Sequence, residues 1–172
     1  MTLGRFSRWT GRWRSWRSWP GKRIPLHATS DGKVLLAYLS QAELAGCLTP
    51  PLRRFTDRTI TTLDEFSPVL VEVRRRGFAT AVEELETGLT AIAVPVRNAE
   101  GDVVASISAS GPSFRIPADR IPAIAESVRR AAAEVSRRLG WTGSQDLPCV
   151  NSSHKLASVF HAASDRASWT RS

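Results

Sequence analysis

Three serine hydroxyl groups recur at every second position in the segment Val103–Pro112. They belong to Ser106, Ser108 and Ser110. Side chains alternate between the two faces of a β-strand, so these hydroxyls are expected to share one face. The other face would carry Val103, Ala105, Ile107 and Ala109. Such a strand can pack against a core on one side and offer hydrogen-bonding hydroxyls to a ligand on the other. An ordinary half-exposed strand is the alternative.

The histidines do not complete a hydrolytic site around these serines. A triad needs a nucleophile, a base and an orienting acid in contact with one another. Ser108 and His27 form the only formal pair, since His154 and His161 belong to the C-terminal segment. A serine in the middle of a strand does not lie on the exposed turn that such nucleophiles use, and a lone histidine before a helix is typical of a structural role. We therefore predict no catalytic residues and no enzyme activity.

Metal and cofactor chemistry is also poorly supported. The acidic segment 83–86 could act as a general base or bind a cation, but without a second cluster a solvated turn is favoured. Cys47 and Cys149 show neither metal-ligand nor disulfide-framework spacing. Asp31-Gly32-Lys33 lacks the upstream glycine of a phosphate-binding loop. The sequence predicts no metal site and no cofactor, and it favours a small-molecule-binding or interaction domain.

The elements that must position the serine strand are predicted from cap residues and periodicity. Thr29 or Ser30 can cap a helix that runs to Leu39, and Ser40 with Glu43 has the spacing of a capping box. The further expected elements are a helix from Thr62 to Arg76 ended by Gly77, strands at Phe78–Val82, Thr90–Val96 and Val103–Pro112, and a long helix at Ala118–Leu139. Helices, an antiparallel meander and a closing helix indicate an α+β fold.

Three details of these elements carry expectations of their own. Pro95 indicates a strand edge or a bulge, because proline cannot donate to a sheet ladder. The run Arg74–Arg76 is better explained by its place in the last turn of a helix, where cations interact favourably with the helix dipole, than by a nucleic-acid patch. The long helix has apolar residues at core spacing, namely Ile121, Ile124, Val128, Ala131, Ala132, Val135 and Leu139.

Charge is distributed unevenly along the 172 residues, although the net charge is +8. Residues 1–23 hold seven basic and no acidic side chains, whereas residues 24–140 hold 14 of each. The body is therefore neutral and shows no electrostatic footprint for nucleic acid. We expect one domain at residues 21–140 between disordered tails at 1–20 and 141–172. No apolar run is long enough to span a membrane, no secretory signal is evident, and the two cysteines fit a cytoplasmic location.

An ordered set of motifs resembles the IclR family of transcriptional regulators over about residues 21–140. The motifs are Leu-His-Ala-Thr-Ser-Asp-Gly-Lys-Val-Leu-Leu-Ala at 26–37, Arg-Arg-Arg-Gly-Phe at 74–78, Glu-Glu…Gly at 83–88, Ala-Val-Pro-Val-Arg at 93–97 and Ser-Ile-Ser-Ala-Ser-Gly-Pro at 106–112. The resemblance implies a GAF-like effector-binding domain, in which helices flank an antiparallel sheet. It also implies a small-molecule effector, such as an organic acid or an aromatic metabolite, and a homo-oligomer (dimer or tetramer).

By the same resemblance, the effector would contact residues from one helix start and three strands. They are Thr29, Ser30, Asp31, Gly32, Ala81, Ala91, Ser108 and Ser110. Similar proteins often carry an acidic residue at the position of Ala81 and a cysteine at that of Ala91. Two alanines enlarge the cavity and remove polar groups, so a bulkier or more apolar effector becomes plausible.

Family members couple this domain to an N-terminal helix-turn-helix, and residues 1–20 are too few to form one. We therefore expect contact with DNA only indirectly, through a module missing from this chain, and no contact with membranes. Two alternatives remain. The arginine- and tryptophan-rich residues 1–20 could bind nucleic acid non-specifically, or the chain could be a dimerisation partner that modulates full-length relatives.

Overall fold

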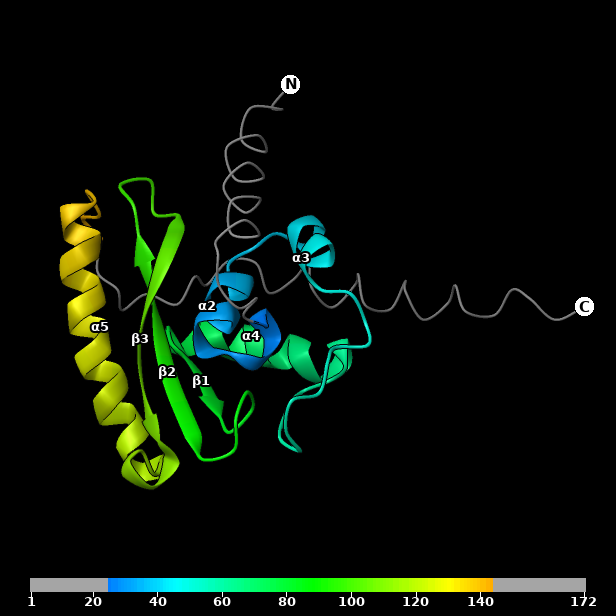
Figure 1. Cartoon of the computed structure of the whole chain (residues 1–172). Coiled ribbons are helices and arrows are strands. Elements are labelled where there is room, and N and C mark those ends of the chain that lie inside the picture. Colours follow the sequence, from blue (N-terminus) through cyan, green and yellow to red (C-terminus); the bar gives the residue numbers. More distant parts are fainter. Residues whose placement is uncertain (1–24, 144–172) are drawn as a thin grey trace, which may run out of the picture.

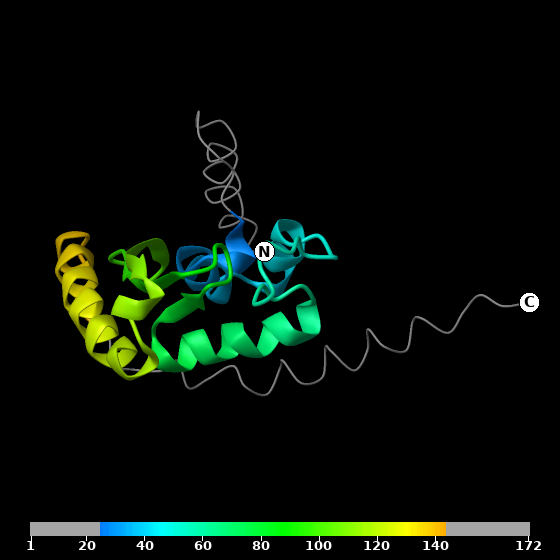
Figure 2. The same ribbon diagram turned by 60° about the horizontal axis from the view of Figure 1, so that its bottom comes forward.

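Residues 25–143 are described by the computed structural model, and they form three layers (Figure 1). A three-stranded sheet lies between helix α5 on one face and helices α2 and α4 on the other, and Figure 2 shows α4 running beneath α2. The elements in chain order are η1 (Leu26–Ala28), α2 (Ser30–Ala37), α3 (Gln41–Cys47), α4 (Leu63–Arg76), β1 (Ala79–Val82), β2 (Leu89–Arg97), β3 (Val103–Pro112), η2 (Ser113–Arg115), η3 (Ala118–Arg120) and α5 (Ile121–Arg138). The predicted α+β class is confirmed.

Side-chain caps fix the helix starts where the sequence predicts them. Thr29 Oγ1 accepts the Gly32 N–H at 3.2 Å, so Thr29 is the N-cap of α2. Ser40 and Glu43 form a reciprocal capping box at α3, and Thr62 Oγ1 accepts the Glu65 N–H at 3.3 Å at α4. Each cap satisfies one of the backbone donors that a helix start leaves without a partner.

The sheet is an antiparallel meander of order β1-β2-β3. Its register pairs Ala81 with Ala91 and Ala91 with Ser110, so these three residues form one lateral row across the sheet. The next row pairs Ala93 with Ser108. Directly paired residues point to the same side, and Ser106, Ser108 and Ser110 therefore share one face as predicted.

A β-bulge near the start of β3 changes the predicted facing of one residue. Val96 pairs with Ala105 and Arg97 with Val103, so Val104 is the extra residue. The prediction that Val103 shares a face with Ala105 is therefore wrong, because the extra residue shifts the alternation. Pro95 lies beside this bulge and beyond the last β1 pair, where the central strand β2 is locally an edge, as expected.

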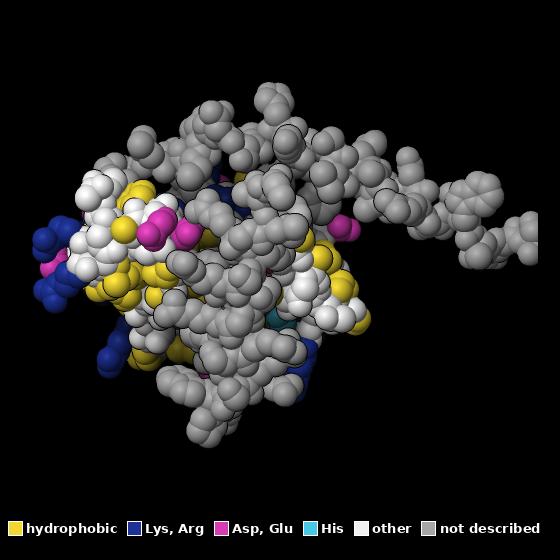
Figure 3. All heavy atoms as spheres, turned by 90° about the horizontal axis from the view of Figure 1, so that it is seen from above, with side chains coloured by type: hydrophobic (Ala, Val, Ile, Leu, Met, Phe, Trp, Pro, Cys, Tyr) yellow, Lys and Arg dark blue, Asp and Glu magenta, His cyan; other side chains and the backbone are white. Residues whose placement is uncertain are grey.

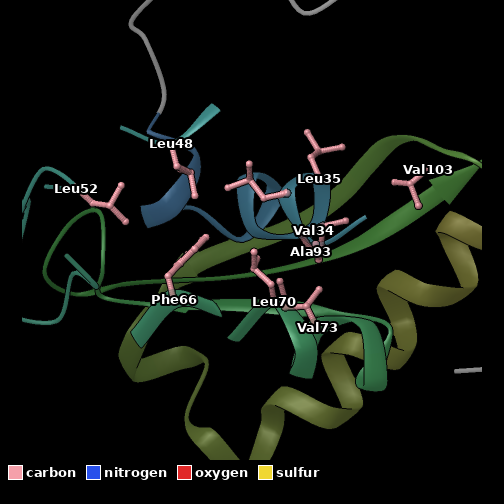
Figure 4. Packing of buried hydrophobic residues seen from close by; sticks show 12 residues of the cluster. Val34, Leu35, Leu48, Leu52, Phe66, Leu70, Val73, Ala93 and Val103 are labelled. Atoms are coloured by element: carbon pink, nitrogen blue, oxygen red, sulfur yellow. The ribbon is translucent and has the colours of Figure 1, made fainter. Parts of the chain in front are cut away.

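Apolar clusters lie on both sides of the sheet. Phe66, Leu70 and Val73 of α4 point toward α2, where Val34 lies on the side that faces them (Figure 4). The cluster also contains Ala79 and Ala93 of the sheet. On the opposite face, Val94 and Val96 pack against Val128 and Ala132 of α5. The two clusters hold α2 and α5 against opposite faces of one sheet.

The long helix α5 buries fewer of its apolar residues than its periodicity predicts. Val128 and Ala132 are buried, but Ala131 is exposed, and Val135 and Leu139 are 39% and 47% exposed. Ser136 is buried in their place, since its hydroxyl donates to the Ala132 carbonyl and accepts the Arg97 N–H. The core prediction is therefore wrong for Ala131, Val135 and Leu139.

The predicted tails lie largely outside the described residues, and so does the arginine- and tryptophan-rich arm. Trp141, at the start of the predicted C-terminal tail, donates its backbone N–H to the Ser136 carbonyl at 2.9 Å. The Arg97 guanidinium lies 5.9 Å from the Trp141 ring and 4.8 Å from the Tyr38 ring. Within residues 25–143, no helix is long and apolar enough to cross a membrane.

Candidate functional site

The first turn of α2 lies across one face of the sheet, from β3 to β1. Ser106 on β3 donates its hydroxyl to Asp31 Oδ1 at 2.7 Å. At the other side, Lys33 Nζ donates to the Thr80 carbonyl of β1 at 3.0 Å. These two polar contacts fix the helix start against the face that carries the serines. We call this surface, formed by Ala81, Ala91, Ser106, Ser108 and Ser110, the serine face.

Beyond α2, the serine face remains accessible toward the end of β3. Ser108 and Ser110 are exposed, Ala91 is half-buried and Ala81 is buried. The Ala81–Ala91–Ser110 row thus offers two methyl groups and one hydroxyl along a line, with the Ser108 hydroxyl one row away. The register places these four predicted site residues together on one face.

The predicted residues at the start of α2 have different local roles. Thr29 Oγ1 is engaged within the chain, because it donates to the Pro25 carbonyl and accepts the Gly32 N–H. Ser30 is 1% exposed, and its hydroxyl has no hydrogen-bond partner within the described part of the chain. A buried hydroxyl without a partner is costly, so it marks a position where a polar ligand atom would be stabilising.

Gly32 is required for close packing. A Cβ atom at this position would lie 2.1 Å from the Leu26 carbonyl oxygen and 2.4 Å from the Leu26 Cα atom. The absence of a side chain lets the first turn of α2 pack directly on η1. The structure thus explains Gly32 through backbone approach.

A buried ion pair beside the site was missed by sequence reasoning. Lys33 is 2% exposed, and its ammonium group contacts Glu84 Oε1 at 2.5 Å. Burial lowers the pKa of Lys33, while the carboxylate of Glu84 acts in the opposite direction. The prediction of a solvated turn is therefore wrong for Glu84. The signal was a lysine among apolar residues in a helix, with one unpaired acidic cluster elsewhere in the chain.

Two threonines hold the turn that carries Glu84. Thr59 Oγ1 donates to the Glu84 carbonyl at 2.6 Å, and Thr56 Oγ1 donates to the Glu83 carbonyl at 2.6 Å. The segment between α3 and α4 therefore fixes the β1–β2 turn from outside. This arrangement keeps the carboxylate of Glu84 facing Lys33 and so stabilises the start of α2.

The suggested pairing of His27 with Ser108 has no support in the described contacts. His27 is 6% exposed, and its Nε2 atom lies 2.9 Å from the Arg53 carbonyl oxygen. Its ring also faces Phe55, with the ring centroids 5.9 Å apart. These contacts join η1 to the segment after α3, which is a structural role. Among residues 25–143, no three His, Cys, Asp or Glu side chains gather in a way that could hold a metal ion.

A separate groove lies on the opposite side of the sheet, with a volume of about 410 Å³. Its lining comes from Ile107 and Ala109 on β3, from Arg120 of η3 and from one flank of α5. None of the eight predicted site residues lines this groove, which we call the α5 groove. The two faces of β3 therefore have different chemistry, with hydroxyl groups on one and an apolar depression on the other.

Removing the Ser106 hydroxyl is expected to loosen α2 from β3. In Ser106→Ala, Asp31 loses a donor, and the free energy of unfolding should fall by about 1.5–3 kcal/mol, as for other hydrogen bonds to charged groups. Urea denaturation followed by circular dichroism measures the change. Ser127→Ala is a matched control, because the described contacts of the Ser127 hydroxyl stay within its own helix: it donates to the Ala123 carbonyl and accepts from Arg130. Equal effects of both substitutions would contradict this assignment.

Comparison with known proteins agrees with the arrangement. The family model for the C-terminal region of the bacterial transcriptional regulator IclR matches residues 11–137. The HTH-type transcriptional regulator KdgR of Escherichia coli K12 is 38% identical over 122 residues, which cover 70% of this chain and 46% of KdgR. The repressor AllR of Salmonella typhimurium is 40% identical over 121 residues, covering 70% and 44% of the two chains. The chain spans about half the length of these relatives.

Solved structures give the same result at the level of the fold. The crystal structure of the C-terminal domain of KdgR matches with a TM-score of 0.65 and 38% identity, covering 70% of this chain and 74% of that domain. The inducer-binding domain of PobR from Acinetobacter, a double mutant in complex with 3-hydroxybenzoic acid, matches with a TM-score of 0.62 and 35% identity, covering 67% of each chain. This chain therefore belongs to the IclR family of bacterial transcriptional regulators and matches the C-terminal effector-binding domain of that family.

Proposed function

We propose that the chain binds a small organic acid or aromatic metabolite on the serine face and acts as the sensing domain of a transcriptional regulator. The observation that carries the proposal is the Ser30 hydroxyl in the first turn of α2, which is buried and has no described partner. Asp31 of the same turn is bonded to Ser106, on the face that also carries Ser108 and Ser110. The relative PobR, whose inducer-binding domain was solved with 3-hydroxybenzoic acid, supports an aromatic acid as the first ligand to test.

The chemistry of the face fits such a ligand. Ala81 and Ala91 give a flat apolar floor that an aromatic ring can cover, and hydroxyls at its border can bind polar substituents. The first turn of α2 carries the positive end of the helix dipole, which favours a carboxylate nearby. Small floor residues would accommodate a larger or more apolar ligand than a short hydroxy acid.

The partners follow from the same proposal. The sensing domain would span about residues 21–140, work in the cytoplasm as a homo-oligomer, and influence DNA indirectly, through a helix-turn-helix module. It would bind its ligand without transforming it. His27, the only histidine in the described residues, is occupied by backbone and ring contacts.

Thermal-shift measurements with 3-hydroxybenzoate and a panel of aromatic and aliphatic acids test ligand binding. A ligand whose free concentration is about 100 times its Kd raises the free energy of unfolding by about 2.7 kcal/mol. For a chain of this size, that corresponds to a rise in Tm of roughly 5–10 °C. Ser108→Ala/Ser110→Ala should lose most of this shift. Ser67→Ala/Ser127→Ala is the control, because both of its hydroxyls donate to carbonyls of their own helices. Full ligand stabilisation in the first variant would refute the site.

A further inference from the structure

A small polar cluster is enclosed between α2 and the turn that follows β1. It consists of Ser30, Lys33 and Glu84, and we call it the Lys33 cluster. Charged side chains of α5 lie at the surface, on the left of Figure 3. In the Lys33 cluster, by contrast, the side chains of Lys33 and Glu84 are only 2% and 11% exposed, and Ser30 is 1% exposed. Polar groups that are buried to this extent need hydrogen-bond partners.

Helix geometry brings the members of the cluster together. Ser30 and Lys33 are three positions apart in α2, so they are neighbours on one side of the helix. Side chains in a helix tilt toward its N-terminus, and the Lys33 side chain therefore leads back over the turn that holds Ser30. Its ammonium group contacts Glu84 Oε1 at 2.5 Å and the Thr80 carbonyl at 3.0 Å. We therefore expect the Ser30 hydroxyl to lie beside the ion pair.

Each member of the cluster has hydrogen-bonding capacity that the described contacts do not use. The Glu84 Oε2 atom is buried and has no partner within residues 25–143, and the same holds for the Ser30 hydroxyl. An ammonium group has three N–H donors, and the described contacts of Lys33 use two of them. The cluster therefore offers an acceptor at Glu84, a donor at Lys33 and a hydroxyl at Ser30 that can both donate and accept.

The Lys33 cluster lies at one end of the Ala81–Ala91–Ser110 row on the serine face. Thr80, which accepts from Lys33, directly precedes Ala81 in β1. Ser110 lies at the other end of the row, two strand spacings or about 9.6 Å away. A benzene ring with a hydrogen bond of about 2.8 Å at each end spans a distance of the same order. A ring that covers the two alanines can therefore reach polar groups at both ends of the row.

We propose that the Lys33 cluster binds a hydroxyl group of the ligand, and that the ligand is an aromatic acid whose ring carries this hydroxyl away from the carboxylate. The hydroxyl donates to Glu84 Oε2 and accepts from Lys33 or Ser30, so it meets the acceptor and a donor together. The carboxylate accepts from the serine hydroxyls at the other end of the row. The inference rests on the proposed function, because it assigns the second polar group of the same ligand.

The proposal predicts which ring substituents are accepted. An ether oxygen can accept but cannot donate, and a hydrogen atom can do neither, so neither provides the donor that Glu84 Oε2 lacks. A site that is built to bind a buried hydroxyl rejects the analogue without it, because the polar groups of the site are then left without partners. We therefore expect benzoate and methoxybenzoates to bind about 10- to 100-fold more weakly than the matching hydroxybenzoate, as for loss of a hydrogen bond to a charged group.

Isothermal titration calorimetry on the full chain tests this preference with 3-hydroxybenzoate, 4-hydroxybenzoate, the two corresponding methoxybenzoates and benzoate. The variant is Ser30→Ala, which leaves the Lys33–Glu84 ion pair in place and so avoids the unfolding expected when the pair is broken. It should reduce the preference for the hydroxyl group by about 2- to 10-fold, the effect of one hydrogen bond. Ser127→Ala is the control, because its described contacts stay within α5, and it should leave the preference unchanged.

The outcomes separate the inference from the proposed function. A hydroxyl preference that Ser30→Ala reduces and Ser127→Ala does not would support the inference. Equal affinities for hydroxybenzoate and benzoate, both weakened by Ser108→Ala/Ser110→Ala, would overturn it and leave the proposed function standing, with a buried water in the cluster. A preference that Ser30→Ala leaves unchanged would also overturn it, because the hydroxyl would bind elsewhere. If no aromatic or aliphatic acid bound, the proposed function and the inference would both fall.

Discussion

Replacing Glu84 by glutamine is expected to lower the free energy of unfolding by about 3–5 kcal/mol, the cost of leaving one buried charge without its partner. Lys33 is 2% exposed, and its ammonium group would keep neutral acceptors, the Thr80 carbonyl and the new amide oxygen, but would lose its counter-charge. Because Lys33 joins α2 to β1, the start of α2 would also lose its position over the serine face. Urea denaturation at pH 7 measures the loss.

The stability difference between the wild type and Glu84→Gln should depend on pH, which distinguishes a lost ion pair from a general packing defect. Without Glu84, desolvation acts alone, so the pKa of Lys33 falls further below that of the unfolded chain. Between these two pKa values the unfolded variant binds more protons than the folded one, and the stability of the variant therefore rises with pH relative to the wild type. The gap should narrow in the alkaline range. Glu86→Gln, at an exposed position in the same turn, should change stability by less than about 0.5 kcal/mol. A constant gap at all pH values would contradict the ion-pair explanation.

Gly32→Ala is expected to be the most damaging single-methyl change in the described fold. The added Cβ would lie 2.1 Å from a backbone oxygen and 2.6 Å from the carbonyl carbon of Leu26. Backbone atoms cannot move aside as a flexible side chain can, so η1 and α2 must separate. We expect a loss of about 3 kcal/mol, at the upper end of overpacking costs, and weaker ligand binding because Ser30 moves with the helix start.

A second glycine provides the matched control for this substitution. Gly46 lies in α3, and a Cβ there would meet nothing within 4 Å. Gly46→Ala should stabilise the chain by about 0.5–1 kcal/mol, because alanine restricts the unfolded backbone more than glycine does. Comparison of the two variants by urea denaturation isolates the effect of close packing. Equal stability changes would show that Gly32 is not constrained by Leu26.

Local signals predicted the elements well, because caps and alternation act over a few residues. Thr29, Ser40 and Thr62 each donate or accept bonds within three or four positions, so their types and spacing determine where helices begin. The Val103–Pro112 strand was recognised from its alternation, and its serines share a face as expected. The family resemblance then selected Ala81 and Ala91, which no property of an isolated alanine could have done.

The features that escaped prediction depend on contacts between distant segments. Lys33 and Glu84 are 51 positions apart, and the neighbours of neither residue identify the other as its partner. Val103 lies on the face opposite to the predicted one because of the bulge at Val104. That bulge depends on how β2 and β3 align, which the alternation within one strand does not reveal. Val135 has core spacing in α5, yet the described residues do not cover it. Periodicity reports which residues need burial, but it does not say which surface buries them.

The ligand is proposed to bind on the serine face. Nuclear magnetic resonance tests this most directly, by following the backbone amide chemical shifts while 3-hydroxybenzoate, or the strongest ligand of the thermal-shift panel, is added. We expect the largest chemical-shift changes at residues 29–32, at Ala91 and at Ser108 to Ser110. These changes should saturate, and Ser108→Ala/Ser110→Ala should need a higher ligand concentration to reach saturation. Saturable shifts confined to Ala123, Ser127 and Ala131 would place the ligand in the α5 groove instead and contradict the account.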